Sequence, residues 1–337
     1  MSETLKIIIP TAGFGSRLRP HTWSRPKPLV SAAGNTVLGH VLETLKTAPD
    51  ADSAELVFIV GYLGDQIQAY MRANYPEIKA HFVQQEALLG QSHAIAMARD
   101  HLQGPTLIVF VDTVVETDFS FLDDTDAEAV IWVKEVEDPR RFGVVDVGED
   151  GWVRGLIEKP DSLDNNLAIV GIYYFKRGED LLAAIDRQIK DGIQTKNEYF
   201  LADAMDLMLK EGLRMRPEPV DVWLDAGLPE TVLQTNQHLL AHGRDNSAEV
   251  AKRPGLQVSA PVFVHPAATV EDSQIGPNVS IGRECLVRGS RLANVVLEAK
   301  AEVVDCDLQD SIIGERARVS GIKGSVNVGD DSTVSVD

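Results

Sequence analysis

The sequence predicts two folded parts, a mostly parallel, Rossmann-like α/β sheet and a C-terminal β-helix. Short, wholly apolar segments alternate with amphipathic segments in the first part of the chain, and six-residue repeats of aliphatic residues occupy its last quarter. The chain has 337 residues, which is enough for two domains of ordinary size. We therefore expect one domain at 1–240 and another at 261–337, joined by a connector at 241–260.

Three apolar segments, at 6–10, 56–60 and 106–111, have the length and composition of buried strands. They show no polar alternation, which is typical of strands covered on both faces. Amphipathic segments with helical spacing, at 37–45 and 65–73, lie between them, and this order predicts a parallel sheet. Ligands of such sheets bind beyond the carboxyl ends of the strands. The segments that follow Ile9, Val60 and Val111 are therefore the candidate site.

The end of the chain repeats an aliphatic residue every six positions. One hexapeptide begins at Ile275 and the next at Ile281. This is the pattern of a β-helix, in which the aliphatic residue fills the interior of each turn. The register slips between Val287 and Gln309, so some turns are expected to be irregular. We expect Cys285 and Cys306 to be small buried residues of this coil. Further turns begin at Val264, Ile313 and Val328, each with a small residue four places on, at Ala268, Ala317 and Ser332.

The overall charge excludes some classes of partner. The formal charge is −19, from 32 basic and 51 acidic side chains, so most of the surface repels nucleic acid and anionic membranes. No apolar run approaches the roughly 20 residues that a membrane span needs. The N-terminal residues lack a signal-peptide pattern, and two cysteines cannot form a disulfide framework. We expect a cytoplasmic protein.

The acidic residues are unevenly spread, and their gap indicates an anion site. Residues 4–42 contain no Asp or Glu, where about six would be expected from the average. The same segment carries five basic side chains: Lys6, Arg17, Arg19, Arg25 and Lys27. A basic, acid-free segment in an acidic protein is typical of a site for a small polyanion.

A glycine-rich loop follows the first strand, and two basic residues accompany it. Glycines at 13 and 15 let the backbone N–H groups approach a phosphate closely. Arg17 can add a planar guanidinium fork, and Lys27 a point charge. A dinucleotide-binding loop would need a glycine at Leu18 and an acid about 20 residues on, and neither is present. A P-loop would need Gly-Lys-Ser/Thr at its end, which is also missing.

The loop resembles the signature of the sugar-1-phosphate nucleotidyltransferases. The similarity covers Gly13-Phe14-Gly15-Ser16-Arg17-Leu18-Arg19-Pro20 and Pro26-Lys27-Pro28-Leu29. It continues in order through Gln85–Ala94, Val111-Asp112, Phe142-Gly143-Val144, Ile157-Glu158-Lys159-Pro160, Val170–Tyr173, Asn197-Glu198-Tyr199 and Trp223–Gly227. The resemblance implies the nucleotidyltransferase fold and, as in several family members, a C-terminal left-handed β-helix of hexapeptide repeats.

The resemblance also implies a role for each matching residue. Arg17 and Lys27 match the basic pair that grips the triphosphate, and Asp112 and Asp225 match the carboxylates that hold Mg²⁺. The nucleotide would contact Ala12, Gly13, Gly15, Gln85 and Gly90. The sugar phosphate would contact Gly143, Glu158, Lys159, Gly171 and Glu198. The implied substrates are a nucleoside triphosphate and a hexose 1-phosphate, and the implied products are a nucleotide sugar and pyrophosphate.

The residue types suit this chemistry. Both reactants are polyanions, so positioning and charge neutralisation dominate the reaction. Asp112 and Asp225 each follow an apolar strand-like segment, so we expect both carboxylates at strand ends over one cleft, as hard ligands suited to Mg²⁺. Alone, either Asp would be read as a turn or helix cap. For His93 a helix-start or loop position is the favoured interpretation.

The sequence departs from the family at three positions. Val111 stands where a glycine usually precedes the metal aspartate, Ser31 stands where proline is common, and Ser16 stands where threonine is common. None of these changes removes a charged group that the chemistry uses.

Other functions are weighed against this one. A non-catalytic regulatory or scaffold subunit would be expected to have lost at least one of the four charged site residues. All four are present: Arg17, Lys27, Asp112 and Asp225. Acyl transfer by the β-helix would need a histidine base, and His265 is the only histidine after residue 242. The amide of Gln85 can pair with a uracil or thymine edge, which favours UTP or dTTP over the GTP of a mannose-1-phosphate guanylyltransferase. We expect the β-helix to join subunits into a homo-oligomer.

Overall fold

The computed structural model describes residues 4–336 and divides the chain into two compact units. The first unit contains the chain up to Gly13, Val41–Val111 and Val115–Trp223. The second contains Phe14–His40, Asp112–Val114 and the chain from Leu224 onward. Three segments that are far apart in the sequence therefore fold together in each unit.

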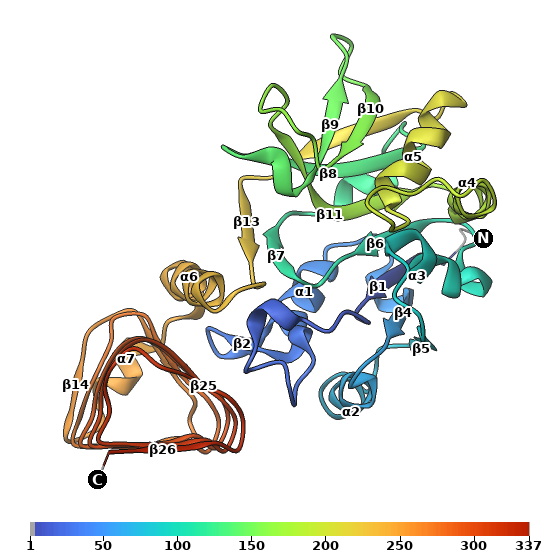
Figure 1. Cartoon of the computed structure of the whole chain (residues 1–337). Helices are drawn as coiled ribbons and strands as arrows, with labels where there is room; N and C mark the ends of the chain where they lie inside the picture. Colours follow the sequence, from blue (N-terminus) through green and yellow to red (C-terminus); the bar gives the residue numbers. More distant parts are fainter. Residues whose placement is uncertain (1–3, 337) are drawn as a thin grey trace. The chain divides into compact units, whose positions relative to one another are not determined.

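A large mixed sheet forms the first unit, and its strands run in the order β10-β9-β11-β6-β1-β4-β5 (Figure 1). The neighbours β1, β4, β5 and β6 are parallel, which confirms the predicted parallel sheet for the first part of the chain. Strand β11 adds antiparallel pairing with β6, β8 and β9, and β12 lies parallel to β8. The bounds are β1 (Lys6–Pro10), β4 (Glu55–Val60), β5 (Ala80–Gln84), β6 (Thr106–Val109), β8 (Ala129–Glu135), β9 (Gly143–Val147), β10 (Val153–Glu158), β11 (Leu167–Phe175) and β12 (Met215–Pro219).

Helices cover this sheet because each has one apolar face. Helix α4, for example, buries Leu181, Ala184 and Ile185, and its acidic first turn and basic last turn complement the helix dipole. The α-helices are α2 (Gly64–Asn74), α3 (Gln91–Met97), α4 (Gly178–Lys190) and α5 (Leu201–Lys210). Short 3₁₀ turns lie at Ala51–Ser53, Arg99–His101, Ser120–Asp123 and Pro139–Arg141. A buried apolar core joins α3, α4 and α5 to strands β1, β4, β6, β8 and β11.

Three elements carry the chain from one unit to the other. They are α1 (Val37–Leu45), β7 (Thr113–Glu116) and β13 (Val222–Asp225), and β7 pairs with β13 in a two-stranded sheet.

The second unit is built around a coil of short parallel strands, triangular in section (Figure 1). Aliphatic residues such as Val264, Ile281, Leu297 and Ile313 lie in successive turns and are fully buried inside it. The predicted β-helix is therefore confirmed. Its strands are β14 (Leu256–Val258), β15 (Val262–Val264), β16 (Thr269–Glu271), β17 (Ser273–Ile275), β18 (Val279–Ile281), β19 (Leu286–Arg288), β20 (Arg291–Leu297), β21 (Glu302–Val304), β22 (Asp307–Ile313), β23 (Arg318–Ser320), β24 (Lys323–Gly324), β25 (Asn327–Val328) and β26 (Thr333–Ser335).

The turns of the coil are shorter than three hexapeptides. Val264 pairs with Ile281, 17 residues on, whereas Ile281 pairs with Leu297 and Leu297 with Ile313, each 16 residues on. Asn294 and Asp310 adopt left-handed backbone conformations inside the long strands β20 and β22, so single residues make these corners. A turn of 16 residues therefore holds two five-residue steps and one six-residue step, which explains the register slip after Val287. Both cysteines are buried in this coil, as predicted, and burial raises the pKa of Cys285 to about 12.

The other parts of the second unit pack on the coil. They include two 3₁₀ turns, η1 (Ser16–Leu18) and η2 (Lys27–Leu29), the hairpin β2 (Ser31–Ala32) and β3 (Asn35–Thr36), the helices α6 (Pro229–Leu239) and α7 (Ser247–Val250), and a π-helical turn at Leu240–Arg244. Leu18 and Val30 belong to one buried apolar cluster with Val232 of α6 and with Val296 and Ile312 of the coil.

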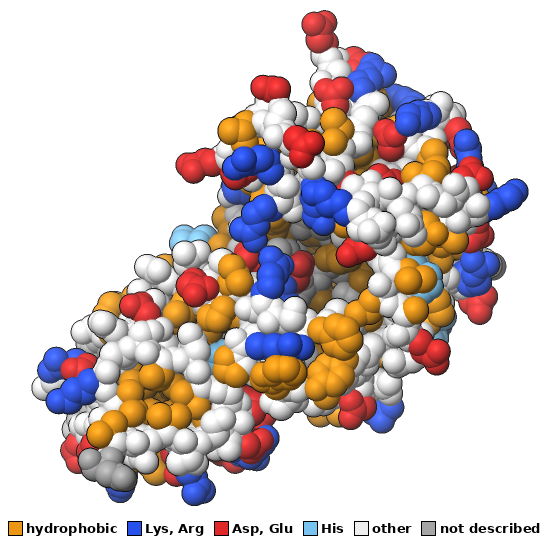
Figure 2. All heavy atoms as spheres, in the orientation of Figure 1, with side chains coloured by type: hydrophobic (Ala, Val, Ile, Leu, Met, Phe, Trp, Pro, Cys, Tyr) orange, Lys and Arg blue, Asp and Glu red, His pale blue; other side chains and the backbone are white. Residues whose placement is uncertain are grey.

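The surface carries many charged side chains of both signs (Figure 2), as expected from a sequence in which 25% of the residues are charged. Acidic and basic side chains are interspersed over the face drawn in Figure 2, with small apolar patches between them. None of the helices in residues 4–336 has the length and apolar character that a membrane crossing requires.

Candidate functional site

Lys27 and Asp112 lie together in the second unit. Lys27 begins the short turn η2 between two prolines, Pro26 and Pro28, whose fixed φ angles restrict this part of the backbone. The Lys27 side chain is only 12% exposed, and its Nζ lies 3.5 Å from Oδ2 of Asp112. The Asp112 side chain is half exposed, so it can still bind a further group.

Asp225 and Arg17 belong to the same unit. The N–H of Ala226 donates to the carbonyl oxygen of Asp112 at 3.0 Å, which places the two aspartates on adjoining backbone segments. Oδ1 of Asp225 accepts from the N–H of Gly227 at 2.8 Å. A Cβ at Gly227 would lie 2.8 Å from this oxygen and 3.4 Å from Nη2 of Arg17. A glycine therefore leaves room for both charged groups.

Gly15 is another predicted site residue, and it lies in the same glycine-rich loop as Arg17. Its φ of +60° favours glycine, and a Cβ there would lie 3.0 Å from Cβ of Lys27. The hydroxyl of Thr22 donates to its carbonyl oxygen at 2.8 Å. The loop backbone is thus packed directly against the residue that carries the ammonium group.

These four charged residues fit the expected magnesium ion. Mg²⁺ is commonly held by one or two carboxylates together with phosphate oxygens of a substrate. Asp112 and Asp225 supply two hard oxygen ligands from neighbouring segments, and Arg17 and Lys27 lie beside them as partners for phosphate.

The predicted nucleotide contacts Ala12 and Gln85 follow two parallel strands of the first unit, β1 and β5, which lie on either side of β4. Ala12 follows β1, Gly61 follows β4 and Gln85 follows β5. A Cβ at Gly61 would lie 2.8 Å from the carbonyl oxygen of Ala12, so glycine permits this close approach. Gly13, the last residue of this segment, is exposed, with nothing within 4 Å of a built Cβ.

The amide of Gln85 has a defined orientation. Its Nε2 lies 3.1 Å from the carbonyl oxygen of Ala87 and 3.3 Å from Nδ1 of His93. A carbonyl oxygen can only accept, so the amide nitrogen must face Ala87. His93 follows the N-terminus of α3, as the favoured interpretation expected, and it also contacts this amide.

Gly90 is held by backbone contacts. Its φ is +113°, and a Cβ there would lie 2.6 Å from both the nitrogen and the oxygen of Tyr199. The N–H of Tyr199 donates to the carbonyl oxygen of Leu89, and the N–H of Ser92 donates to that of Tyr199, each at 2.9 Å. The segment that carries Gly90 is therefore fastened to residues just after Glu198.

Three of the predicted sugar-phosphate contacts lie together. Glu158 pairs with Gly143 across β10 and β9, and a Cβ at Gly143 would lie 2.9 Å from Oε2 of Glu158. Lys159 has its Nζ 3.7 Å from Oε1 of Glu158 and 4.2 Å from the ring centre of Phe200. Burial raises the pKa of Glu158 above its ordinary value, and the nearby Lys159 opposes this shift.

The remaining two sugar-phosphate candidates occupy other elements of this unit. Gly171 lies in β11 with a φ of +90°, and its carbonyl oxygen accepts from the N–H of Phe110 at 3.0 Å. Glu198 is exposed and closes a tight turn with Thr195, in which Lys196 and Asn197 both have positive φ.

Sequence reasoning missed Asp203. Its Oδ1 accepts from the hydroxyl of Thr195 at 3.3 Å, and its Oδ2 is buried without a hydrogen-bond partner among the described residues. Burial raises its pKa, and its charge contributes to the raised pKa of Glu158. Asp203 lies in the first turn of α5. An acid there is usually interpreted as a helix-dipole partner, so the pattern alone could not have identified it.

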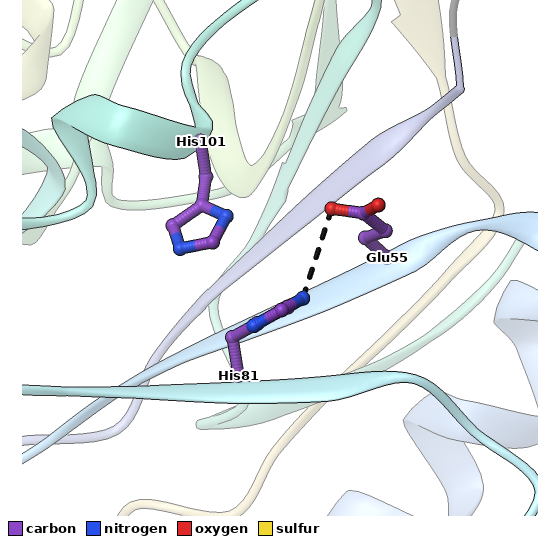
Figure 3. A group of neighbouring side chains, drawn as sticks. All are labelled: Glu55, His81 and His101. Carbon is purple, nitrogen blue, oxygen red and sulfur yellow. Dashed lines mark ion pairs between the residues drawn. The ribbon is translucent and has the colours of Figure 1, made fainter.

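One group of three potential metal ligands lies elsewhere among residues 4–336, formed by Glu55, His81 and His101 (Figure 3). Glu55 is already paired with Lys79 and with Nζ of Lys6 at 3.0 Å. Hydrogen bonds from Lys79 and then Lys6 lower its pKa to about 2. Glu55 and Lys6 begin their strands, at the sheet edge opposite the carboxyl ends. Two ammonium groups disfavour a cation, so we interpret the group as a structural charge cluster.

A hollow in the first unit, about 620 Å³ in volume, contains none of the predicted site residues. It is lined by four acidic residues and no basic one: Glu116, Asp118, Glu218 and Asp221. Such a lining repels phosphate, so the hollow does not suit a polyanionic substrate.

The chain is similar to known nucleotidyl transferases along most of its length. Residues 6–242 match the Nucleotidyl transferase family. The chain is 34% identical over 238 residues to the bifunctional protein GlmU of Methanocaldococcus jannaschii, and the match covers 69% of this chain and 54% of that protein. The chain thus spans about half the length of that relative.

Two other relatives match over nearly their whole length. The low-salt glycan biosynthesis nucleotidyltransferase Agl11 of Haloferax volcanii is 29% identical, with 94% of each chain covered. A glucose-1-phosphate thymidylyltransferase of Streptomyces antibioticus is 26% identical, with 98% of this chain and 99% of that protein covered. A solved UDP-glucose pyrophosphorylase in complex with UDP-glucose has the same fold, with a TM-score of 0.60 and 18% identity over 71% of this chain and 100% of that chain.

Proposed function

Because the chain belongs to the nucleotidyl transferase family, we propose that it transfers a nucleoside monophosphate from a nucleoside triphosphate to a hexose 1-phosphate and releases pyrophosphate. The observation that carries this proposal is the grouping of Arg17, Lys27, Asp112 and Asp225 in the second unit, with Lys27 Nζ 3.5 Å from Asp112 Oδ2. The similarity to two thymidylyltransferases of Streptomyces supports the same substrates.

The reaction joins two polyanions, so its main requirement is positive charge in fixed positions. A phosphate oxygen of the sugar 1-phosphate attacks the α-phosphorus in line, and the bond to pyrophosphate breaks. Lys27 and Arg17 neutralise the negative charge that builds up on the departing pyrophosphate. Asp112 and Asp225 would hold Mg²⁺, which supplies a further positive charge to the triphosphate oxygens.

The orientation of Gln85 supports a preference for certain bases. With Nε2 directed to Ala87 and His93, Oε1 remains available to accept from a base. Uracil and thymine carry N3–H and guanine carries N1–H, whereas cytosine N3 and adenine N1 are acceptors. Adenine and cytosine could donate only from an exocyclic amino group, so Oε1 suits the ring N–H of uracil, thymine and guanine. Within that group, the similarity to thymidylyltransferases supports UTP or dTTP.

The buried carboxylate of Glu158 and the ammonium of Lys159 suit a phosphorylated sugar. We assign Glu158 to a sugar hydroxyl, because an ionised carboxylate accepts hydrogen bonds strongly. Lys159 is assigned to the phosphate of the sugar. Gly143, Gly171 and Glu198 remain assigned to the sugar from the resemblance alone. Assembly into a homo-oligomer through the β-helix remains a prediction. A cytoplasmic location also remains a prediction.

Pyrophosphate release tests the proposal directly. The protein is incubated with Mg²⁺, each of UTP, dTTP, GTP, CTP and ATP, and a set of hexose 1-phosphates that includes amino sugars. We expect turnover with UTP or dTTP that requires both substrates and stops when the metal is chelated. The variant Lys27→Ala serves as the control for contaminating activity. Absence of turnover with every pair would contradict the proposed function, and turnover with GTP alone would support a guanylyltransferase.

A further inference from the structure

The loop that carries Lys27 is bound by carboxylates of the β-helix. Nη1 of Arg25 lies 2.5 Å from Oε2 of Glu298, and its Nη2 lies 2.7 Å from Oε2 of Glu315 and 3.7 Å from Oδ2 of Asp330. We refer to Glu298, Glu315 and Asp330 as the coil carboxylates. They are 273 or more residues away from Arg25 in the sequence, yet they belong to the same unit.

These ion pairs are buried and well satisfied. The side chains of Arg25, Glu298 and Asp330 are 11%, 5% and 5% exposed. A buried carboxylate is costly unless its oxygens accept several hydrogen bonds. Asp330 meets this condition, because it accepts from the N–H of Glu315 at 2.7 Å and from the hydroxyl of Ser24 at 2.8 Å.

The coil carboxylates hold the loop on both sides of Lys27. On one side, Ser24 and Arg25 bind Asp330 and Glu298. On the other side, Glu298 accepts from the N–H of Ser31 at 2.8 Å and from its hydroxyl at 2.7 Å. Lys27 lies between these two attachment points, and its Nζ is directed to Asp112. A change at Glu298 therefore removes a contact at both ends of the segment that positions the ammonium group.

Ser31 gives a second reason to regard these contacts as specific. Proline at this position would have neither an N–H nor a hydroxyl to donate. Both bonds from Ser31 to Glu298 would be lost with proline. Ser31 therefore commits both its N–H and its hydroxyl to the coil.

We propose that Arg25 and Glu298 form a positioning pair that fixes Lys27 for catalysis, so that the β-helix is part of the triphosphate site. This inference rests on the proposed nucleotidyl transfer. Neither residue touches the reacting atoms; each acts through the backbone of residues 26–30. The coil then has a role in turnover that does not depend on subunit assembly.

The test compares variants of the full chain. Glu298→Gln removes the charge, and Arg25→Lys keeps a charge but loses the planar fork. Ser31→Ala removes one hydroxyl, leaves no buried charge unpaired, and so guards against a coil that fails to fold. Glu302→Gln is the matched control, because Glu302 pairs with Arg318 at 3.4 Å within the coil itself.

Three measurements are made on each variant: hydrogen exchange, steady-state kinetics and the Kd for inorganic pyrophosphate. Hydrogen exchange of residues 29–31 reports whether the loop is released, because the Ser31 amide donates to Glu298. Steady-state kinetics report kcat and the KM of each substrate. For Glu298→Gln we expect faster exchange at 29–31 and a kcat lower by about 10- to 100-fold, as displacements of this kind produce. The KM for the sugar 1-phosphate should change by less than about twofold. The exchange rate and kcat of Arg25→Lys should lie between those of Glu298→Gln and those of the unaltered protein. Glu302→Gln should match the unaltered protein in both quantities.

The two possible failures are distinguishable. Lack of turnover by the unaltered protein would contradict the proposed function. The role of Arg25 and Glu298 would then be decided by hydrogen exchange at residues 29–31 and by the Kd for inorganic pyrophosphate, because neither measurement needs turnover. Unchanged exchange in both Glu298→Gln and Ser31→Ala would overturn the anchoring. Faster exchange with unchanged kcat and pyrophosphate affinity would overturn the positioning role. An equal loss of kcat in Glu302→Gln would show a general effect of coil stability instead.

Discussion

At the scale of single residues, the proposed function depends on a few charges that the fold brings close together. Lys27, Asp112 and Asp225 come from three distant segments, yet they lie on adjoining backbone in one unit. Charge in such a site is hard to replace, because a neutral group of the same shape leaves the phosphates uncompensated. Each of the following substitutions removes one charge and keeps most of the surrounding packing.

We expect Asp112→Asn and Asp225→Asn each to lower kcat by at least about 100-fold, which corresponds to about 2.7 kcal/mol of transition-state stabilisation. Each variant loses a charged ligand for Mg²⁺ and keeps its size. The assay is pyrophosphate release at saturating Mg²⁺, with thermal unfolding to check the fold. Asp146→Asn, at an exposed position of β9, is the control. Near-normal rates in both variants would rule out the two-carboxylate site.

Lys27→Ala and Lys6→Ala separate a catalytic charge from a structural one within the same acid-free segment. Lys6 pairs with Glu55, away from Lys27 in the sequence and in the other unit. We expect Lys27→Ala to lower kcat strongly, whereas Lys6→Ala should leave kcat unchanged and lower only the free energy of unfolding, because it removes one of the two ammonium partners of Glu55. Small, equal effects on kcat would mean that the basic segment is only a gap in the charge pattern.

Glu158→Gln should increase stability at neutral pH while weakening sugar phosphate binding. Because burial raises the pKa of Glu158 in the folded protein, folding stability is lost as pH rises from the ordinary value of 4.5 through the raised pKa. The amide cannot ionise and avoids this loss. Thermal unfolding at pH 7 and pH 4 measures the effect: the variant should be more stable at pH 7 and gain little at pH 4. If Glu158→Gln unfolds at a lower temperature than the unaltered protein at pH 7, this prediction is wrong.

The residues whose motifs are contiguous were the ones that sequence could predict. Lys27 lies in an uninterrupted signature, and Gln85 begins another. Asp203 was missed because one acid at a helix start has an ordinary explanation. The partners of Arg25 were missed because a contact across 273 residues leaves no local pattern. The roles of the site residues remain predictions, whereas membership of the family is confirmed.

At the scale of elements, the coil shows how much a repeat pattern predicts. Aliphatic residues at Ile275 and Ile281 correctly indicated a β-helix, because each must fill the interior. The number of residues in each turn could not be predicted from the sequence. One residue with positive φ can make a corner that would otherwise take two residues. Several corners use residues other than glycine in this conformation, among them Lys300 with a φ of 61°.

Lys300→Gly should therefore stabilise the coil. The left-handed conformation costs a residue with a Cβ about 1–2 kcal/mol, and glycine avoids this cost. Glycine also gives the unfolded chain more conformational entropy, which offsets part of the gain. The net gain in the free energy of unfolding should be about 0.5–1 kcal/mol. Thr333→Gly, in the strand β26, is the control and should destabilise the protein. A loss of stability from Lys300→Gly would show that the corner is not strained.

At the scale of the whole molecule, the spacing of the motifs alone predicts two domains that work separately. The catalytic motifs end at Gly227 and the repeats begin after residue 262, so this spacing predicts that a chain truncated near Ala248 keeps its nucleotide site. The contacts within the second unit lead to a different expectation. Truncation removes all three coil carboxylates and uncovers Leu18 and Val30, which pack against Val296 and Ile312.

We expect the chain that ends at residue 248 to lose most of its turnover and to unfold at a lower temperature. Exposing an apolar cluster and leaving Arg25 without its partners are both costly. Pyrophosphate release and thermal unfolding at low protein concentration measure the two effects, and sedimentation of both chains reports any change of subunit number. Full turnover by the truncated chain would restore the view that the domains act independently.

A bond that holds two parts of a protein together transmits free energy in both directions. If the coil stabilises the conformation of residues 24–31 that binds triphosphate, then triphosphate bound there must stabilise the coil by the same amount, since linkage between two equilibria is reciprocal. Pyrophosphate alone should then slow hydrogen exchange in β20 and β22, and it should do so less in Glu298→Gln. Anything that tightens or loosens the β-helix, including a subunit packed against it, would thereby become an effector of the enzyme.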